Sequence, residues 1–194
     1  AHHARHIVLD PVMVATSGAK LIDDDAITAL TERLFPLAEV ITPNIPETEV
    51  LLDLIAHRGA SLDPAKWAED TDRESTRIVS DTAMEDAGRT VSEHYGCAVL
   101  VKGGHLAGEP EIITDVLLAD GKISLLQDRR IETTANHGTG CTLSSAIAAE
   151  LAAGLRLGEA VARARQYLRA GLHYGVTAGH GAGSLGHAVT MPWT

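Results

Sequence analysis

Aromatic residues and cysteines are scarce in this 194-residue chain, and both shortages limit what it can be. Aromatics make up 3% of the residues, so a core must be built from Leu, Ile, Val and Ala. Aliphatic strands and alanine-rich helices favour an α/β fold over an all-β sandwich. The two cysteines, Cys97 and Cys141, give neither a disulfide framework nor metal-ligand spacing. With no membrane-length apolar run and no signal peptide, we expect a cytoplasmic protein without a membrane partner.

Positive charge is also in short supply. The 26 acidic residues outnumber the 16 lysines and arginines, for a formal net charge of −10. This balance argues against a nucleic-acid partner, because a phosphate backbone requires a basic face. It does not exclude a nucleotide, since backbone N–H groups and one lysine can hold phosphates in an acidic protein. We therefore expect a small-molecule ligand and no nucleic acid.

Short aliphatic runs alternate with helical patterns along the chain. The runs predict strands at 7–9, 38–42 and 98–101, and a hairpin over 115–123 with Asp120-Gly121 as its turn. Helical spacing follows Asp23, with Ile27, Leu30 and Leu34 on one face, and recurs from Pro46, from Ala83, from Cys141 to Gly154, and from Leu157 to Leu172.

This alternation of strands and helices predicts an α/β fold with right-handed crossovers, a largely parallel central sheet and flanking helices. No second-domain boundary is evident, so we expect a single domain over 1–194. The stretch 58–82 is polar, charged and without a clear period, and we interpret it as a surface insertion.

Polar residues and glycines recur where the predicted strands end. They are Asp10, Asn44 with Glu47, Lys102-Gly103-Gly104, and the loop before Cys141. In open α/β sheets, ligands bind outside the carboxyl ends of the strands. The common position of these residues therefore predicts a ligand site there.

The most specific pattern is Gly138-Thr139-Gly140-Cys141 at the start of a predicted helix. Glycines let a backbone approach a ligand closely, and a helix start offers unpaired N–H groups, so the pattern suits phosphoryl oxygens. It is not a Walker A loop, because the required Gly and Lys spacing is absent. On local pattern alone, a glycine-rich turn that opens a core helix is an equally good interpretation.

Four blocks of sequence carry a family resemblance, and they occur in the family's order. They are LDPVMVATSG at 9–18, TPNIPE at 42–47, VLVKGGH at 99–105 and HGTGCTLSSA at 137–146. Together they resemble the ribokinase-like hydroxymethylpyrimidine/phosphomethylpyrimidine kinases of thiamin biosynthesis. In that branch, cysteine replaces the aspartate that takes the proton from the substrate hydroxyl in other ribokinase-like enzymes.

The resemblance implies a role for each matching residue. Cys141 is implied as the catalytic base, beside the anion loop of Gly138, Thr139 and Gly140. For ATP and Mg²⁺, it implies Lys102, Gly103 and Gly104 at the phosphates, Asn44 and Glu47 at the metal through water, and Asp10 close to the metal. The pyrimidine pocket is implied to be lined by Val12, Met13, Val14 and Ala15.

Each role has a plainer alternative. Glu47 can be a first-turn helix carboxylate, Asp10 a turn aspartate and Lys102 a solvated lysine at a strand end. The side chains of 12–15 can serve only as core, and Cys141 can be a tight-fitting residue of a helix N-terminus.

Taken together, the resemblance implies phosphorylation of 4-amino-5-hydroxymethyl-2-methylpyrimidine and its monophosphate by MgATP. The alternatives are a pyridoxal/pyridoxine kinase of the same fold and a non-catalytic ribokinase-like module. The family's N-terminal segment has no counterpart here, so we expect the C-terminal portion of the fold and an uncertain activity for the chain alone. The family often forms dimers, so a homodimer is one implied assembly.

Overall fold

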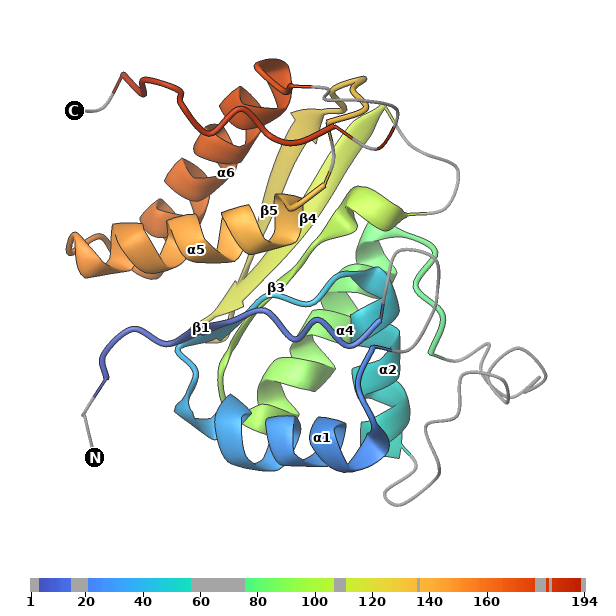
Figure 1. Cartoon of the computed structure of the whole chain (residues 1–194). Helices are drawn as coiled ribbons and strands as arrows, with labels where there is room; N and C mark the ends of the chain where they lie inside the picture. Colours follow the sequence, from blue (N-terminus) through green and yellow to red (C-terminus); the bar gives the residue numbers. More distant parts are fainter. Residues whose placement is uncertain are drawn as a thin grey trace. The chain divides into compact units, whose positions relative to one another are not determined.

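The strands form one five-stranded sheet in the order β1-β2-β3-β4-β5 (Figure 1). β2 and β3 pair in parallel, whereas β3 and β4 pair antiparallel. The α/β prediction is confirmed, and the sheet is mixed because β4, the first strand of the hairpin with β5, runs antiparallel to β3. The strands are β1 Val8–Leu9, β2 Val40–Ile41, β3 Ala98–Val101, β4 Ile112–Ala119 and β5 Lys122–Arg129.

This computed structural model describes residues 4–14, 21–56, 76–106, 111–135, 137–176, 181 and 183–192. The chain folds as two compact units. The first unit is Leu9–Asp128, and the second unit is Ala1–Val8 with Arg129–Thr194. Most of the predicted insertion at 58–82 lies outside the described residues, and in its described end Ile78 is buried. Among the described helices, none is long and apolar enough to cross a membrane.

The turn between β4 and β5 follows the prediction from Asp120-Gly121. Asp120 has φ 51° and Gly121 has φ 71°. Two-residue hairpins need positive φ at both central positions, which glycine adopts freely and aspartate tolerates. The side chains of β4 are largely buried, whereas those of β5 alternate between half-buried and exposed.

The first helix departs from regular spacing, and this changes its buried face. α1 (Asp24–Ala29) continues as a π-helical turn η1 (Leu30–Leu34) and a 3₁₀ turn η2 (Phe35–Leu37). The prediction that Leu34 shares one helix face with Ile27 was wrong, because Ile27 is buried, Leu34 is 47% exposed and Phe35 is fully buried instead. A π turn holds more residues than an α turn, so later positions rotate relative to regular helical spacing.

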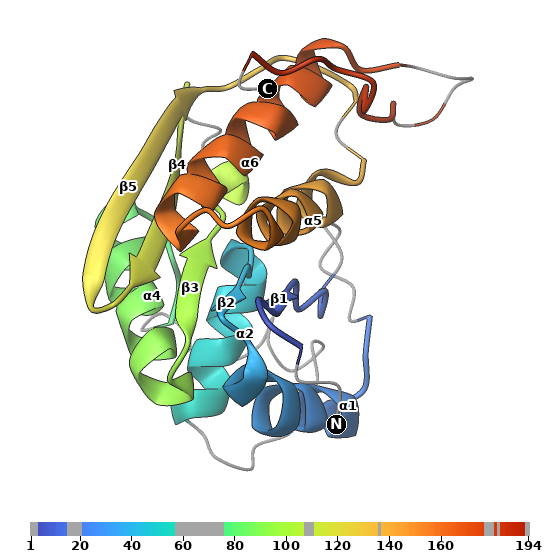
Figure 2. The ribbon, with the colours of Figure 1, turned by 90° about the vertical axis from the view of Figure 1, so that its left-hand side faces the viewer.

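Helices α2 (Ile45–Ala56) and α4 (Asp81–Tyr95) pack against each other in the first unit, and α4 also packs on β3 and β4 (Figure 2). The N-cap Ser80 accepts a hydrogen bond from the Ala83 N–H, and Gly96 ends the helix at φ 70°. Next to this end, burial raises the pKa of Cys97 to about 11. Cys97 is therefore the small core residue that its position before β3 predicts.

The second unit is built on two helices, α5 (Thr139–Ala152) and α6 (Leu157–His173), which lie side by side in both ribbon views. Gly154, at φ 95°, follows the end of α5 as predicted. Beyond α6, Val176 and Ser184 exchange two backbone hydrogen bonds of 2.9 Å. The buried side chains of α5 and α6 include Leu143, Ile147, Leu151, Ala160, Val161 and Ala164.

Candidate functional site

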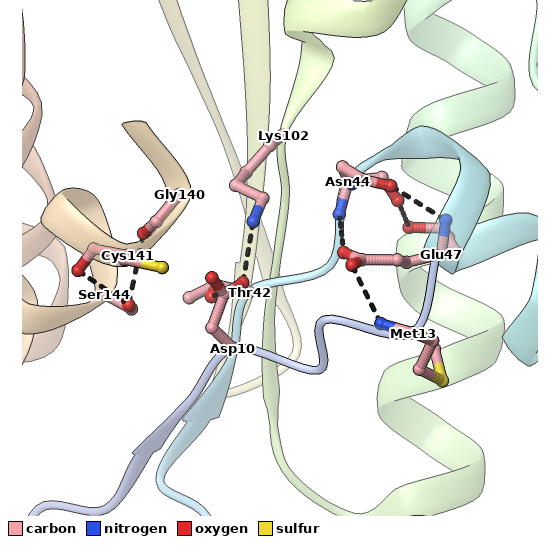
Figure 3. Close-up of polar contacts among 10 residues, drawn as sticks. Asp10, Met13, Thr42, Asn44, Glu47, Lys102, Gly140, Cys141 and Ser144 are labelled. Atoms are coloured by element: carbon pink, nitrogen blue, oxygen red, sulfur yellow. Dashed lines mark hydrogen bonds and ion pairs between the residues drawn. The ribbon is translucent and has the colours of Figure 1, made fainter. Parts of the chain in front are cut away.

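The predicted site residues of the first unit lie together where β1, β2 and β3 end (Figure 3). Lys102 donates its backbone N–H to the Pro43 carbonyl at 2.9 Å, and it pairs with Asn44 in a parallel bridge. The pairing of β2 with β3 thus continues past both strands, which sets Asn44 beside Lys102. The Thr42 N–H donates to the Leu9 carbonyl at 3.0 Å, so Asp10 is fixed at the same edge.

Asp10 and Lys102 form an ion pair at this edge. The Lys102 Nζ lies 2.7 Å from the Asp10 Oδ1, and the Thr42 hydroxyl donates to that same oxygen at 3.0 Å. The side chains of Lys102 and Asp10 are 15% and 12% exposed, so the pair is shielded without being closed off. An ammonium fixed in this way is a compact positive charge suited to phosphate oxygens.

Glu47 is held on three sides and is 3% exposed. Its Oε2 accepts the Asn44 N–H at 2.8 Å, while its own N–H donates to the Asn44 Oδ1 at 2.9 Å, in a reciprocal cap of α2. Its Oε1 accepts the Met13 N–H at 3.2 Å. Glu47 therefore is a first-turn helix carboxylate, and it also ties α2 to the segment after Asp10.

Burial raises the pKa of Glu47 above its usual value of 4.5. The positive charge of Lys102 and the N–H donors of Asn44 and Met13 oppose this shift, and the negative charge of Asp10 adds to it. Asp10, Glu47 and Lys102 therefore form one electrostatically coupled group.

The two glycines after Lys102 differ in what they do. Gly103 donates its N–H to the Asp115 Oδ1 at 2.8 Å, and a Cβ added at Gly103 would collide with the Thr114 carbonyl oxygen. Its lack of a side chain is thus needed for packing on β4. Gly104 has open space around it, and both glycines lie in the 3₁₀ turn η4 (Gly103–His105).

The segment predicted to line a pyrimidine pocket has two buried side chains. Met13 is fully buried and Val14 is 7% exposed, so both side chains belong to the core. Val12 is 44% exposed and has φ 43°, a strained conformation for a β-branched residue. Ala15 lies outside the described residues.

The predicted anion loop lies in the second unit, at the start of α5. Gly138, at φ 83°, is the N-cap and gives no side-chain cap. The first helical hydrogen bond runs from the Thr142 N–H to the Gly138 carbonyl, so the N–H groups of Thr139, Gly140 and Cys141 precede the helical pattern. The Cys141 side chain is exposed, and the Ser144 hydroxyl donates back to the Gly140 and Cys141 carbonyls.

A cavity of about 570 Å³ begins at Cys141. It runs along one side of α5 and is bordered by α6 and by the end of the chain. Its lining includes Cys141, Thr142, Ser145, Tyr167, His187 and Met191. Cys141, whose side chain is exposed, is therefore one of the residues that border this space.

The first unit offers carboxylate and amide oxygens suited to Mg²⁺ from Asp10, Glu47 and Asn44. Each Glu47 oxygen already accepts a backbone N–H, which suits contact through metal-bound water rather than direct chelation. Within the described part of the chain, no group of three His, Cys, Asp or Glu side chains forms a metal cage. These residues fit a magnesium ion that arrives with phosphates.

Two side chains that contact the predicted site residues, Thr42 and Asp115, were given no role from the sequence. Thr42 lies inside the TPNIPE block, and Asp115 was noted only as the start of a hairpin. The position of Thr42 directly after a strand and two residues before Asn44 was the available signal. No local pattern links Asp115 with Gly103, because they contact each other across β3 and β4.

Solved structures of other proteins share this arrangement of strands and helices. The pyridoxal kinase from Staphylococcus aureus in complex with AMP-PCP matches with a TM-score of 0.73 and 26% identity, over 95% of this chain and 59% of that one. A phosphomethylpyrimidine kinase from Clostridium difficile 630 matches with a TM-score of 0.60 and 32% identity, over 84% of this chain and 56% of that one. The chain has the ribokinase-like fold.

Sequence comparison identifies the family. The hydroxymethylpyrimidine/phosphomethylpyrimidine kinase of Haemophilus influenzae is 38% identical over 183 residues, which are 93% of this chain and 60% of the relative. The family model described as phosphomethylpyrimidine kinase matches residues 1–70 and 68–186. The chain belongs to the phosphomethylpyrimidine kinase family. It spans about 60% of the length of the relatives named for this kinase alone, and 33% and 22% of a bifunctional and a multifunctional relative.

Proposed function

We propose that this chain serves the MgATP-dependent phosphorylation of 4-amino-5-hydroxymethyl-2-methylpyrimidine, and then of its monophosphate, in thiamin biosynthesis. The observation that carries the proposal is the cluster of Asp10, Lys102, Asn44 and Glu47 at neighbouring strand ends. Family membership and the names of the relatives support it. Complexes of the S. aureus neighbour with AMP-PCP and with ADP support ATP as the donor.

In the proposed transfer, the acceptor hydroxymethyl oxygen bonds to the γ-phosphorus of ATP. The bond from that phosphorus to the β–γ bridging oxygen breaks, and ADP leaves. Negative charge develops on the phosphoryl oxygens during this exchange. Lys102, fixed by Asp10, supplies positive charge that can stabilise these oxygens. The N–H groups at the start of α5 are hydrogen-bond donors of the kind that phosphoryl oxygens accept.

Asp10, Asn44 and Glu47 would hold a magnesium ion at the phosphates, with Glu47 acting through water. When bound, Mg²⁺ would neutralise part of the phosphate charge. The buried, capped position of Glu47 fixes its carboxylate before the ligand arrives, so no side-chain ordering is needed on binding.

Cys141 is the proposed base. Its thiolate would take the proton that the acceptor hydroxyl loses as the new oxygen–phosphorus bond forms. Two features support this role: Cys141 is exposed, and it is among the residues that line the cavity along α5. Both cysteines are free thiols, which supports a reducing, cytoplasmic setting. We also propose the homodimer that the family resemblance implies.

A pyridoxal kinase is the second candidate, and one observation favours it. The TM-score with the S. aureus pyridoxal kinase is 0.73, against 0.60 for the C. difficile phosphomethylpyrimidine kinase. Sequence identity favours a pyrimidine acceptor, because it is 32% with the C. difficile phosphomethylpyrimidine kinase and 26% with the S. aureus pyridoxal kinase. We give identity more weight, because related kinases with different acceptors share one fold.

Acceptor preference tests the proposal. We expect kcat/KM to be higher for the hydroxymethylpyrimidine and its monophosphate than for pyridoxal, with MgATP as donor. The control variant is Lys102→Met, which keeps the length of the side chain and removes its charge, and it should lose activity toward every acceptor. A preference for pyridoxal would contradict the pyrimidine assignment, and no transfer to any acceptor would contradict the kinase proposal for this chain.

A further inference from the structure

Thr42 contacts the candidate site at two points, although no role was assigned to it from sequence. Its backbone N–H donates to the Leu9 carbonyl at 3.0 Å, and its hydroxyl donates to the Asp10 Oδ1 at 3.0 Å. Thr42 is fully buried and directly follows β2. It therefore holds both the backbone before Asp10 and the Asp10 carboxylate, from a rigid strand end (Figure 3).

The oxygen that Thr42 contacts is the one already paired with Lys102. The Lys102 Nζ and the Thr42 Oγ1 both approach the Asp10 Oδ1, at 2.7 and 3.0 Å. An ion pair alone lets a carboxylate turn about its bond to Cβ while one oxygen stays near the ammonium. A second donor on the same oxygen removes that freedom, because both donors must be satisfied at once. The Oδ2 is not engaged by either of them.

We propose that Thr42 is a positioning residue for phosphoryl transfer, which fixes the Asp10 carboxylate so that its Oδ2 is left to hold the magnesium ion of MgATP. This inference rests on the proposed kinase function. Asp10 is 12% exposed, so a ligand can reach it, whereas Thr42 is sealed from solvent and acts only through Asp10. The β-branched side chain of Thr42 has few rotamers, which makes its hydroxyl a rigid donor.

A structural role is the competing explanation, because a buried hydroxyl needs an acceptor wherever it lies. Thr31 in the same unit is such a case, since it is buried and its hydroxyl donates to the Ile27 and Thr28 carbonyls of its own helix. Thr31→Val is therefore the matched control. It removes a buried hydroxyl that has no link to the cluster.

The test compares Thr42→Val, Thr42→Ser and Thr31→Val in steady-state kinetics, with MgADP affinity measured by calorimetry. Valine keeps the shape of threonine and removes the hydroxyl, so kcat/KM for MgATP and MgADP affinity should each fall about tenfold. Serine keeps the hydroxyl, so both values should stay within about twofold of wild type. Thr31→Val should leave both unchanged for the folded protein. If Thr42→Val does not fold, Thr42→Ala takes its place.

A mutant cycle with Asp10→Ala separates the two explanations. If Thr42 acts through Asp10, then Thr42→Val should have no further effect on MgADP affinity when Asp10 is already alanine. Equal MgADP affinities for Thr42→Val and wild type would overturn the positioning role. So would a further tenfold loss of MgADP affinity when Thr42→Val is added to Asp10→Ala. Either result would leave the proposed function standing. A wild-type protein that neither binds MgADP nor transfers phosphate would remove the proposed function, and the role of Thr42 with it.

Discussion

The first unit and the second unit each carry residues that the sequence predicts to be functional, and these residues are held in different ways. In the first unit, Thr42 and Lys102 both contact Asp10, and Asn44 and Glu47 cap each other. At the start of α5 in the second unit, the available groups are backbone N–H groups and one exposed thiol. The first region depends on partners that lie far apart in sequence, and the second depends on the local shape of a loop.

This difference teaches where each region is sensitive to mutation. A side chain that other side chains hold cannot be removed without freeing its partners, so stability and activity should fall together in the cluster. An exposed thiol at a helix start carries little packing, so its removal should affect chemistry alone. The predictions below use this contrast.

The largest effect is expected at Cys141. Replacing the thiol by the hydroxyl of serine should lower kcat for phosphate transfer by roughly 10²- to 10⁴-fold, the usual contribution of a positioned base. The free energy of unfolding should change by less than about 0.5 kcal/mol, because the side chain is exposed. Cys141→Asp should retain measurable turnover, since aspartate has this role in other enzymes of the fold.

Cys97→Ala is the control for Cys141, because it removes the other, buried thiol and should leave turnover per folded molecule unchanged. Acceptor phosphorylation and urea unfolding measure the two effects separately. Wild-type turnover by Cys141→Ser would show that Cys141 is only a tight-fitting residue of the helix start.

A smaller effect, on stability, is expected at Gly103. Gly103→Ala should lower the free energy of unfolding by about 3 kcal/mol, because the new Cβ collides with the Thr114 carbonyl oxygen, which is backbone and cannot turn away. Gly104→Ala is the matched control next to it, with open space around its Cβ, and should cost less than about 1 kcal/mol. Similar unfolding curves for the two variants would contradict the close packing of η4 on β4.

The smallest effect concerns Glu47 and pH. Burial raises the pKa of Glu47 above 4.5, so the folded protein binds this proton more tightly than the unfolded chain does. As pH rises above 4.5, the folded state must ionise a buried carboxyl, and wild-type stability falls until the pH passes the raised pKa. The stability of Glu47→Gln relative to wild type should therefore improve as pH rises through this window.

Urea unfolding from about pH 4 to about pH 8 measures this trend. Glu159→Gln is the control of opposite sign, because hydrogen bonds from Arg156 lower the pKa of Glu159. Glu159→Gln lacks this stabilisation, so its free energy of unfolding relative to wild type should fall as pH rises through the titration of Glu159. A relative stability of Glu47→Gln that is independent of pH would show that burial does not dominate at Glu47.

Local patterns predicted much of the fold. The strand at 98–101 and the turn at Asp120-Gly121 are where we expected them, because a short aliphatic run and a turn dipeptide act within a few residues. The placement of Leu34 failed because a π turn interrupts the helical period, and no residue type announces such a turn.

The candidate site could be predicted only as far as its strand ends. The positions of Asp10, Asn44 and Lys102 after predicted strands, together with the family blocks, predicted that they lie at one edge of the sheet. The structure brings them together there. The contacts that hold them depend on register across the sheet, and a sequence without pairing information does not contain that register. This is why the hydroxyl of Thr42 and the Met13 N–H on Glu47 were missed.

The difference between the two cysteines has a practical consequence. Cys97 is 8% exposed and burial raises its pKa to about 11, so near neutral pH it is a shielded, protonated thiol. Alkylating reagents attack thiolates that solvent can reach, and Cys141 is the exposed cysteine of the pair. Of the two cysteines in this chain, Cys141 is therefore the one that a label can address. A maleimide dye attached there would report on ligands that enter the cavity along α5, with no engineered cysteine.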